Sequence, residues 1–253
     1  MRLQRLNMDT TWLVWLGDTC LLIDPWLQGV EVDYAGWFNT QWHKTPPLSS
    51  DEIAEFDAVL ITQKYPDHCH VMTLKHLQPS LVLAPVSLRG LLNKHLPEAS
   101  IKYFDENVDQ HQVGAVSLRR LPSRCRIGAV YDAYLLRDDQ DSLLIANHGL
   151  SLDDGHAVTL EDVKLDVLLS PFNTYQLPWF FGGMVSPGLG SVKSLIADTL
   201  PRYVVATHDE QKYAHGLIPA LARVEVFDPQ SASQYPWLCD RYLSIPDYRP
   251  VSL

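Results

Sequence analysis

The segment ITQKYPDHCH, residues 61–70, places a carboxylate beside imidazole groups directly after an apolar run. Its polar side chains belong to Gln63, Tyr65, Asp67, His68 and His70. Imidazole and carboxylate groups are common ligands of Zn²⁺, Fe and Mn. In a regular strand, Asp67 and His68 would point to opposite faces, so both can reach one ion only if the chain turns after Pro66. The segment therefore predicts a loop that binds a metal ion.

Two further apolar runs end in residues of the same kind. SLLIANHG ends in Asn147 and His148, and YVVATHDE ends in His208, Asp209 and Glu210. Loops at the carboxyl ends of strands carry the functional groups of open α/β sheets, so we expect the three loops to converge. The predicted metal ligands are Asp67, His68, His148 and His208. The sequence leaves open whether Asn147 or His148 faces the ion, and a lone histidine is more often solvated than a ligand.

Strand groups followed by alternating strands and helices occur twice along the chain, which favours an α/β fold of two halves. The elements expected in the first half are strands at 1–9, 10–18 and 19–26, a helix or turn and a strand over 51–62, a helix at 71–77, a strand at 80–86, a helix at 87–96 with Ser87 as N-cap, and a strand at 100–105. Those expected in the second half are strands at 112–122, 128–138 and 141–149, a helical segment and a strand over 160–172, a helix at 191–200 and a strand at 203–208. The last 30 residues or so predict irregular structure. No linker separates the halves, so we expect one domain over residues 1–253.

Composition narrows the function classes. The formal charge is −10, from 30 acidic and 20 basic side chains, which disfavours a nucleic-acid partner. The four cysteines form no CxxC pair and fit a reducing compartment. The apolar run TWLVWLG is too short for a signal-peptide core, and no run reaches the roughly 18 residues of a membrane span. We therefore expect a cytoplasmic protein with no membrane or nucleic-acid partner.

These motifs resemble the metallo-β-lactamase fold superfamily, most closely its metal-dependent hydrolase branch, which includes the ascorbate-phosphate lactonases. The opening TWLVWLGDTCLLIDPWL resembles the first strands of that family, with its Asp-Pro at Asp24–Pro25. ITQKYPDHCH lies where the family carries Thr-His-X-His-X-Asp-His, and YVVATHDE lies where its last ligand histidine follows a strand. The resemblance implies a four-layer αβ/βα sandwich.

The resemblance also divides the ligands into two sets. Gln63 and Tyr65 stand where two histidines of the first metal are expected, and LPSRCRIG, residues 121–128, supplies no third. The ligands of the second metal match at Asp67, His68 and His208. Asn147–His148 stands in the place of the family's bridging aspartate, with His148 as the candidate replacement ligand. This pattern implies one divalent metal ion, Zn²⁺ first, with Fe or Mn as alternatives.

A single bound metal ion would activate water for hydrolysis of an ester, lactone, amide or phosphoester bond in a small molecule. Asp67 and His68 are the predicted catalytic residues, with Asp67 also a proton acceptor. We expect Asp209 and Glu210 to orient His208, and Gln63 and His70 to lie next to the ligands.

The aromatic loops predict a substrate pocket. Its expected lining residues are Tyr65, Trp26, Trp37 and Trp179. Plain core packing and contact with a second copy of the chain remain alternatives for these aromatic residues. Two other functions stay open for the chain: a catalytically inactive ligand-binding protein, and a non-haem iron oxidoreductase.

Overall fold

The computed structural model describes residues 1–123, 132–150, 160 and 163–253, in two compact units. Unit 1 comprises Met1–Arg119, Glu210–Ala220 and Pro246–Leu253. Unit 2 comprises Arg120–Asp209 and Leu221–Ile245. Most of the segment 121–128, where the third histidine of the first metal was sought, lies outside the described residues. The expectation of one domain over residues 1–253 stays a prediction.

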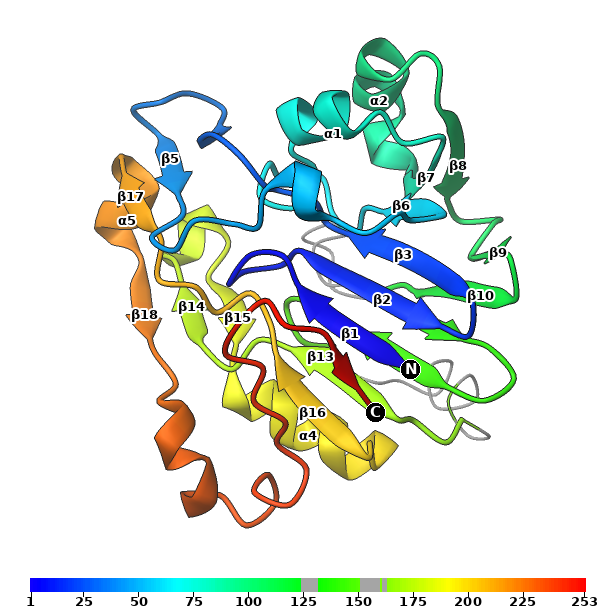
Figure 1. The fold of residues 1–253 in the computed structure, drawn as a ribbon. Coiled ribbons are helices and arrows are strands. Elements are labelled where there is room, and N and C mark those ends of the chain that lie inside the picture. Colours follow the sequence, from blue (N-terminus) through cyan, green and yellow to red (C-terminus); the bar gives the residue numbers. More distant parts are fainter. Residues whose placement is uncertain (124–131, 151–159, 161–162) are drawn as a thin grey trace. The chain divides into compact units, whose positions relative to one another are not determined.

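Unit 1 is built on a seven-stranded sheet with the order β19-β1-β2-β3-β6-β7-β8 (Figure 1). Its strands are β1 (Arg2–Arg5), β2 (Trp12–Leu16), β3 (Thr19–Ile23), β6 (Ala58–Leu60), β7 (Leu81–Pro85), β8 (Ser100–Phe104) and β19 (Val251–Ser252). Neighbours from β19 to β3 are antiparallel, and neighbours from β3 to β8 are parallel. The sheet is therefore mixed. Strand β19 corrects the expectation that the C-terminal residues are wholly irregular.

Burial explains why these segments form strands. Every residue of β3, sequence TCLLI, and of β6, sequence AVL, is buried, as is typical of strands covered on both faces. Leu74 of α1 (Val71–Leu77) and Leu92 of α2 (Arg89–His95) pack in the same apolar core as these strands. The helix predicted at 71–77 is confirmed. Helix α2 starts later than predicted, because a 3₁₀ turn at Val86–Leu88 precedes it, and Ser87 is not its N-cap.

The second large sheet has the order β16-β13-β12-β11-β10-β9. Its strands are β9 (Gln110–Val113), β10 (Val116–Leu121), β11 (Ala133–Arg137), β12 (Ser142–Ile145), β13 (Val167–Ser170) and β16 (Tyr203–Ala206), of which β11, β12, β13 and β16 lie in unit 2. The single strand predicted at 112–122 is instead two strands, because the chain turns at Gly114 with φ of 54°. Strands β12, β13 and β16 are parallel, so the loops that follow them share one edge of the sheet.

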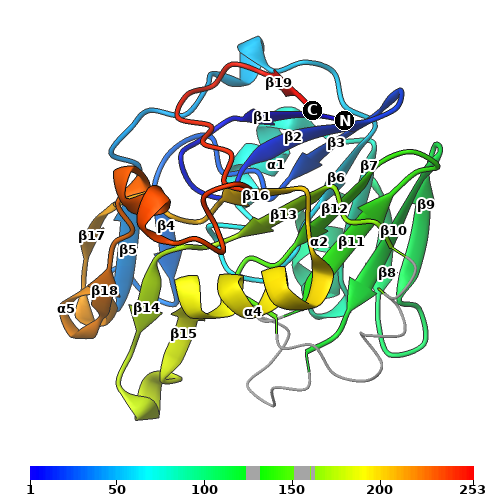
Figure 2. The same ribbon diagram turned by 90° about the horizontal axis from the view of Figure 1, so that it is seen from below.

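Helix α4 (Leu189–Thr199) packs on the sheet of unit 2, as Figure 2 shows. Val192, Leu195 and Ile196 of α4 share an apolar core with Leu168 of β13 and Val204 of β16. The helix predicted at 191–200 is thereby confirmed, with bounds one or two residues earlier. This packing supports β16, whose end carries His208, and β13, which lies between β16 and the strand β12 whose end carries His148.

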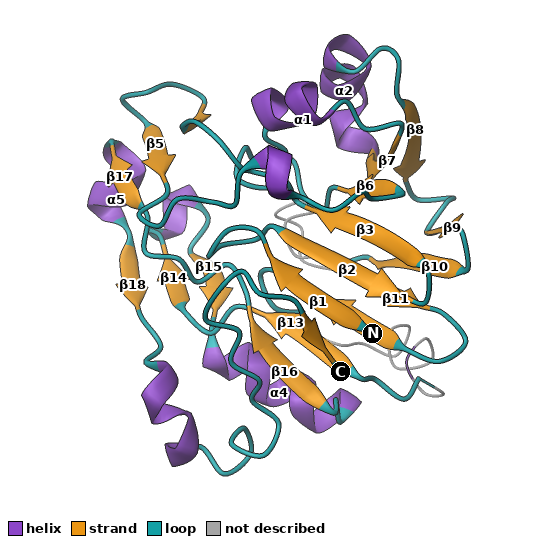
Figure 3. Cartoon of the chain, viewed as in Figure 1, coloured by secondary structure: helices purple, strands orange, loops and turns teal. Residues whose placement is uncertain are grey.

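Two small sheets form in segments where the sequence analysis predicted no strand, apart from the expected irregular structure near the C-terminus (Figure 3). In unit 1 the order is β17-β5-β4, and in unit 2 it is β15-β14-β18. The strands are β4 (Glu31–Asp33), β5 (Asn39–Trp42), β17 (Tyr213–His215), β14 (Thr174–Gln176), β15 (Met184–Pro187) and β18 (Arg223–Glu225). At three or four residues each, they are too short for an alternating pattern to identify them.

The remaining helices of the described residues are short. They are α5 (Leu217–Leu221) and 3₁₀ turns at Ser50–Glu52, Trp179–Phe181 and Pro229–Gln234. Within the part of the chain that the structure describes, no helix has the length and apolar character needed to cross a membrane.

Two glycines near the start of α4 give a test of this packing. Gly188 has φ of 56°, and a Cβ there would lie 2.7 Å from the carbonyl oxygen of Phe172. We expect Gly188→Ala to lower the free energy of unfolding by at least about 1–3 kcal/mol, because both the backbone conformation and the space favour glycine. Thermal and urea unfolding measure the change.

Gly190→Ala is the matched control. Gly190 lies two residues further along and is exposed, and a Cβ on this residue would meet no atom within 4 Å. Alanine has the higher helix propensity, so this variant should be neutral or stabilising by up to about 1 kcal/mol. Equal destabilisation by both substitutions would contradict the described start of α4.

Candidate metal centre

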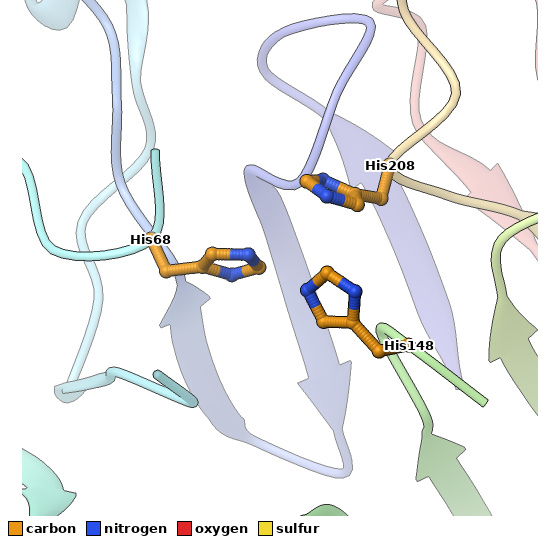
Figure 4. A group of neighbouring side chains, drawn as sticks. All are labelled: His68, His148 and His208. Carbon is orange, nitrogen blue, oxygen red and sulfur yellow. The ribbon is translucent and has the colours of Figure 1, made fainter. Parts of the chain in front are cut away.

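His68 is completely buried in unit 1, in the loop that follows β6 (Figure 4). The carbonyl oxygen of Tyr65 accepts hydrogen bonds from the N–H groups of His68 and Cys69, at 3.0 and 2.8 Å, which makes the turn that the sequence required after Pro66. The Nδ1 atom of His68 lies 2.7 Å from Oδ2 of Asp24. Since Nδ1 donates to this carboxylate, Nε2 is the ring nitrogen that can bind a metal ion.

Asp24, which orients this imidazole, has a strained backbone and a fully hydrogen-bonded environment for its carboxylate. Its backbone is left-handed, with φ of 44°, and its side chain is fully buried. The N–H and hydroxyl of Thr62 donate to its carboxylate at 2.7 and 2.6 Å. Its own N–H donates to the carbonyl of Leu60. The Asp-Pro turn after β3 is thus joined to the end of β6. The sequence singled out Asp24 but assigned it no role in orienting His68.

Asp67 lies beside the second ring nitrogen. Its Oδ2 is 3.8 Å from Nε2 of His68, and Thr10 donates to its carbonyl oxygen at 3.0 Å. Two ligand atoms at about 2.0–2.2 Å from one tetrahedral ion are roughly 3.3–3.6 Å apart. A small side-chain adjustment would therefore let both atoms bind one ion, so these two residues fit the predicted metal.

The electrostatic surroundings of His68 set its protonation. Burial lowers the pKa of the imidazole, but the carboxylates of Asp67 and Asp24 outweigh burial and raise the pKa to about 9. The raised pKa favours the protonated form of the ring at neutral pH, with a proton on Nε2 as well as on Nδ1. Binding of a metal ion at Nε2 would release this proton, so the affinity of the site should depend on pH.

Further carboxylates of unit 1 gather around one lysine, and the sequence analysis missed this cluster. Lys212 Nζ lies 2.5 Å from Oδ2 of Asp9 and 3.5 Å from Oδ2 of Asp67. Burial and then the charge of Asp67 raise the pKa of Glu31 to about 9, and the same two causes raise the pKa of Asp33 to about 6. Burial of several carboxylates together is costly without cations, so this part of unit 1 favours positive charge.

Unit 2 supplies two more histidines at the carboxyl ends of its parallel strands. The rings of His148 and His208 are drawn in Figure 4, with centroids 5.0 Å apart and an interplanar angle of 69°. Nδ1 of His148 lies 3.1 Å from the carbonyl oxygen of Val185 and donates to it, so Nε2 is the ring nitrogen suited to ligation. His208 has a left-handed backbone, with φ of 57°, which is uncommon outside glycine and typical of constrained functional positions.

Of the two candidate residues after β12, His148 has a contact with the last histidine, and the choice between Asn147 and His148 as ligand stays a prediction. His148 makes the ring contact with His208. Asp209 fixes the following loop, since its carboxylate accepts hydrogen bonds from the N–H groups of Phe172 and Asn173 at 2.9 and 2.8 Å. Asp209 therefore ties the loop after β16 to the loop after β13. Asp209 therefore supports the neighbouring His208 by fixing the backbone that both residues share.

Other predicted residues have different contacts from those expected. Glu210 accepts hydrogen bonds from His43 and from the N–H of Thr45, at 2.5 and 3.0 Å, and its predicted contact with His208 stays a prediction. His70 is the N-cap of α1, where Nδ1 accepts a hydrogen bond from the N–H of Thr73. Burial lowers the pKa of His70. The structural role found for His70 is therefore a helix cap.

The four aromatic residues predicted to line a pocket separate into three environments. Trp26 is 0% exposed and its ring is tilted against that of His43 with centroids 3.9 Å apart, so the structure shows it packed in the interior and its role in substrate binding stays a prediction. Tyr65 is half-buried. Trp37 and Trp179 are 69% and 87% exposed, so a role of either in binding a ligand stays a prediction.

Gln63 stands out among the residues beside the predicted ligands. It is 1% exposed, and within the described residues neither its amide nitrogen nor its amide oxygen has a hydrogen-bond partner. An unsatisfied buried amide costs about 1–3 kcal/mol. The sequence predicted a position near the ligands for Gln63 but could not predict this cost.

Comparison with known proteins places these two units in a known fold. The family model described as "Beta-lactamase superfamily domain" matches residues 8–208, which is more than half of the chain. No match was found among curated proteins.

Solved structures similar to the chain agree with the family model. An isothiocyanate hydrolase from Delia radicum gut bacteria is 16% identical with a TM-score of 0.70, covering 100% of this chain and 99% of that chain. A possible metal-dependent hydrolase from Veillonella parvula DSM 2008 is 12% identical with a TM-score of 0.71, with the same two coverages.

A third similar structure has a different chemistry. CmlA, a diiron β-hydroxylase from Streptomyces venezuelae, is 16% identical with a TM-score of 0.67, covering 100% of this chain and 54% of that chain. At these identities the likeness establishes the fold alone. The predicted fold class is thereby confirmed as α/β with mixed sheets.

The buried amide of Gln63 gives a prediction on stability. Methionine has nearly the same shape without the polar atoms, so Gln63→Met should raise the free energy of unfolding by about 1 kcal/mol. Chemical unfolding of the metal-free protein measures the change.

Gln4→Met is the matched control, because Nε2 of Gln4 donates to the carbonyl oxygen of Tyr248 at 2.9 Å. Loss of this hydrogen bond should destabilise the protein by about 0.5–1.5 kcal/mol. A Gln63→Met variant less stable than the parent would contradict the described environment of the amide.

Proposed function

The chain belongs to the metallo-β-lactamase superfamily, and on this premise we propose that it is a hydrolase that uses one divalent metal ion. The observation that carries the proposal is the buried pair of Asp24 and His68, which directs Nε2 of the imidazole toward the carboxylate of Asp67. A histidine fixed by a carboxylate on one nitrogen is the usual arrangement of a metal ligand.

The proposed ligands are Asp67 and His68 from unit 1, and His208 with His148 from unit 2. Each offers one atom of a kind that binds metal ions. A set of imidazoles with one carboxylate suits Zn²⁺ first, and Fe or Mn as alternatives. A bound ion of this kind supplies an activated water and polarises the oxygen of a carbonyl or phosphoryl group.

The residues of the chain have separate tasks in this proposal. Asp24 keeps His68 in one tautomer and orientation. Asp67 accepts a proton from the attacking water, beside the ammonium group of Lys212, which balances its charge. The substrate class is a small molecule with an ester, lactone, amide or phosphoester bond.

A catalytically inactive binding protein is the second candidate, because one contact favours it. Lys212 Nζ already lies 3.5 Å from Asp67, and an ammonium group competes with a metal ion for the same carboxylate. Gln63 and Tyr65 also occupy the positions of two ligands in the superfamily pattern described above. The metal content of the protein decides between the two candidates.

Elemental mass spectrometry of the purified protein tests the proposal. We expect about one equivalent of Zn, Fe or Mn in the parent protein, and its loss in His68→Ala, since this variant removes a central ligand. His76→Ala is the matched control, because His76 lies in the same unit at an exposed position of α1. A parent protein that takes up no metal after incubation with Zn²⁺ or Fe²⁺ would favour the inactive binding protein.

Hydrolysis is measured in the same variants. Chromogenic p-nitrophenyl esters and phosphodiesters and a simple lactone cover the proposed bond types. Turnover in the parent and its loss in His68→Ala, with retention in His76→Ala, is the expected result. Metal binding without turnover of any bond type would leave a metal-binding protein and contradict the hydrolase.

The role of Asp24 generates a further prediction. In Asp24→Asn the amide replaces the carboxylate that accepts from Nδ1 of His68, so the affinity for the metal ion should fall by about 10–100-fold. Competition with a coloured chelator measures this affinity.

Asp57→Asn is the control for that experiment. Oδ2 of Asp57 accepts a hydrogen bond from the N–H of Cys20 at 2.8 Å, in the connection between β3 and β6. The control changes the same functional group in the same sheet without contacting His68. Equal affinities in the parent and Asp24→Asn would show that Asp24 does not orient a ligand.

A further inference from the structure

The small sheet β17-β5-β4 of unit 1 has one polar face that is turned to the interior (Figure 2). Glu31 pairs with Gln41, and Asp33 pairs with Asn39, so these four side chains share that face. Three of them form a hydrogen-bonded row, in which Asn39 donates to Asp33 at 3.0 Å and Gln41 donates to Asn39 at 3.1 Å. Glu31 and Asn39 are 2% and 4% exposed, so the position of the sheet is fixed from this side.

The opposite face of the same sheet is exposed. Alternation of side chains along the paired strands places five residues on it: Val32, Thr40, Trp42, Tyr213 and His215. These five residues form the β5 face. Val32, Trp42 and Tyr213 are 45%, 37% and 51% exposed. The rings of Trp42 and Tyr213 are stacked, with centroids 5.8 Å apart.

Aromatic residues of the turn before β5 continue this surface. Oγ1 of Thr40 donates to the carbonyl oxygen of Gly36 at 2.9 Å, which joins the β5 face to the turn. The rings of Tyr34 and Trp37 contact Phe38 edge-on, with centroids 5.4 and 5.8 Å from that of Phe38. Tyr34 and Trp37 are 84% and 69% exposed, so both rings lie largely in water.

The exposed aromatic area is large for a surface that has no partner. An aromatic side chain has about 150–250 Å² of surface, so Tyr34, Trp37, Trp42 and Tyr213 together expose roughly 350–600 Å². The largest apolar patch of a monomeric protein is typically about 300–600 Å², and a standard interface takes about 800 Å² from each partner. The four rings thus supply half or more of one partner's share, and Val32 adds to it.

Charge favours a second copy of the chain as that partner. The formal charge is −10, from 30 acidic and 20 basic side chains, so two copies repel one another over most of their surface. None of the five residues of the β5 face is acidic. The ammonium of Lys44 lies 5.5 Å from the ring centroid of Tyr213. A face that offers aromatic rings and a cation without a carboxylate matches a copy of itself.

We propose that two copies of this chain associate through their β5 faces, with Val32, Trp42 and Tyr213 at the centre of a twofold contact. Both copies use the same residues in such a contact, so the face must be complementary to itself. Lys44 and the turn aromatics Tyr34 and Trp37 lie at its margin. The inference goes beyond the proposed function and needs no metal ion.

Sedimentation velocity over a series of protein concentrations tests the proposal. We expect the parent protein to pass from monomer to dimer with a Kd of about 1 µM or tighter, since interfaces of standard size reach that range. Val32→Glu places a carboxylate on the face of each copy and should weaken the dimer at least about tenfold. Met72→Glu is the matched control, because Met72 is 60% exposed on α1 of the same unit, and this variant should associate as the parent does.

A mixing experiment separates loss of the contact from loss of folding. Val32→Lys alone should also weaken the dimer, because two ammonium groups then face one another. An equal mixture of Val32→Glu and Val32→Lys should restore association, because the added charges now attract. Folded variants whose mixture stays monomeric would overturn the proposed centre of the contact. If the Val32 variants do not fold, Tyr213→Ala removes an exposed ring without adding charge and should weaken the dimer as well.

Two results would overturn the second copy as the partner. One is a parent protein that stays monomeric at the highest concentration tested. The other is a monomeric parent that sediments with phosphatidylcholine vesicles and loses this binding in Trp37→Ala, which would assign the exposed rings to a lipid surface. The variant His68→Ala separates this inference from the proposed function, because it should dimerise as the parent does even though it lacks a proposed metal ligand.

Discussion

The carboxylate of Asp24 accepts hydrogen bonds from the N–H and hydroxyl of Thr62 and from His68, while its own backbone stays in the left-handed region. A buried carboxylate needs such partners, since loss of hydration is otherwise uncompensated. The partners lie in the segment that follows β6, and Asp24 itself directly follows β3. The parallel pairing of the buried strands β3 and β6 therefore determines the orientation of His68.

The elements that could be predicted from the sequence are those with long apolar runs. Strands β2 and β3 and helix α1 have patterns that are visible over several residues, and the short strand β6 lies within the longer buried apolar run Ala58–Ile61. The small sheets could not be predicted, because strands of three or four residues show no period and form by pairing distant segments. Strand β17 matters most among them, since its pairing with β5 fixes the segment that carries Lys212.

The same distinction holds for the candidate site. Asp67, His68 and His208 could be found because each follows a buried strand and matches a family pattern. Asp9 looked like an ordinary turn residue, and Lys212 looked like an ordinary charged residue, because their contact joins distant parts of the sequence. The sequence shows which residue types follow a strand. Which side chains from distant segments contact one another depends on how the strands pair in the folded sheet.

Lys212 contacts two carboxylates, one of which, Asp67, is also a proposed metal ligand. The contact with Asp9 is 2.5 Å and the contact with Asp67 is 3.5 Å, so Asp9 is the closer partner. The Asp67 carboxylate can therefore turn toward Nε2 of His68 while the lysine keeps Asp9. If Asp67 bound the proposed ion, the ammonium would remain beside that carboxylate as a second positive charge and would reduce the attraction of Asp67 for the ion. The affinity of the proposed metal and the reach of Asp67 as a proton acceptor both depend on this shared carboxylate.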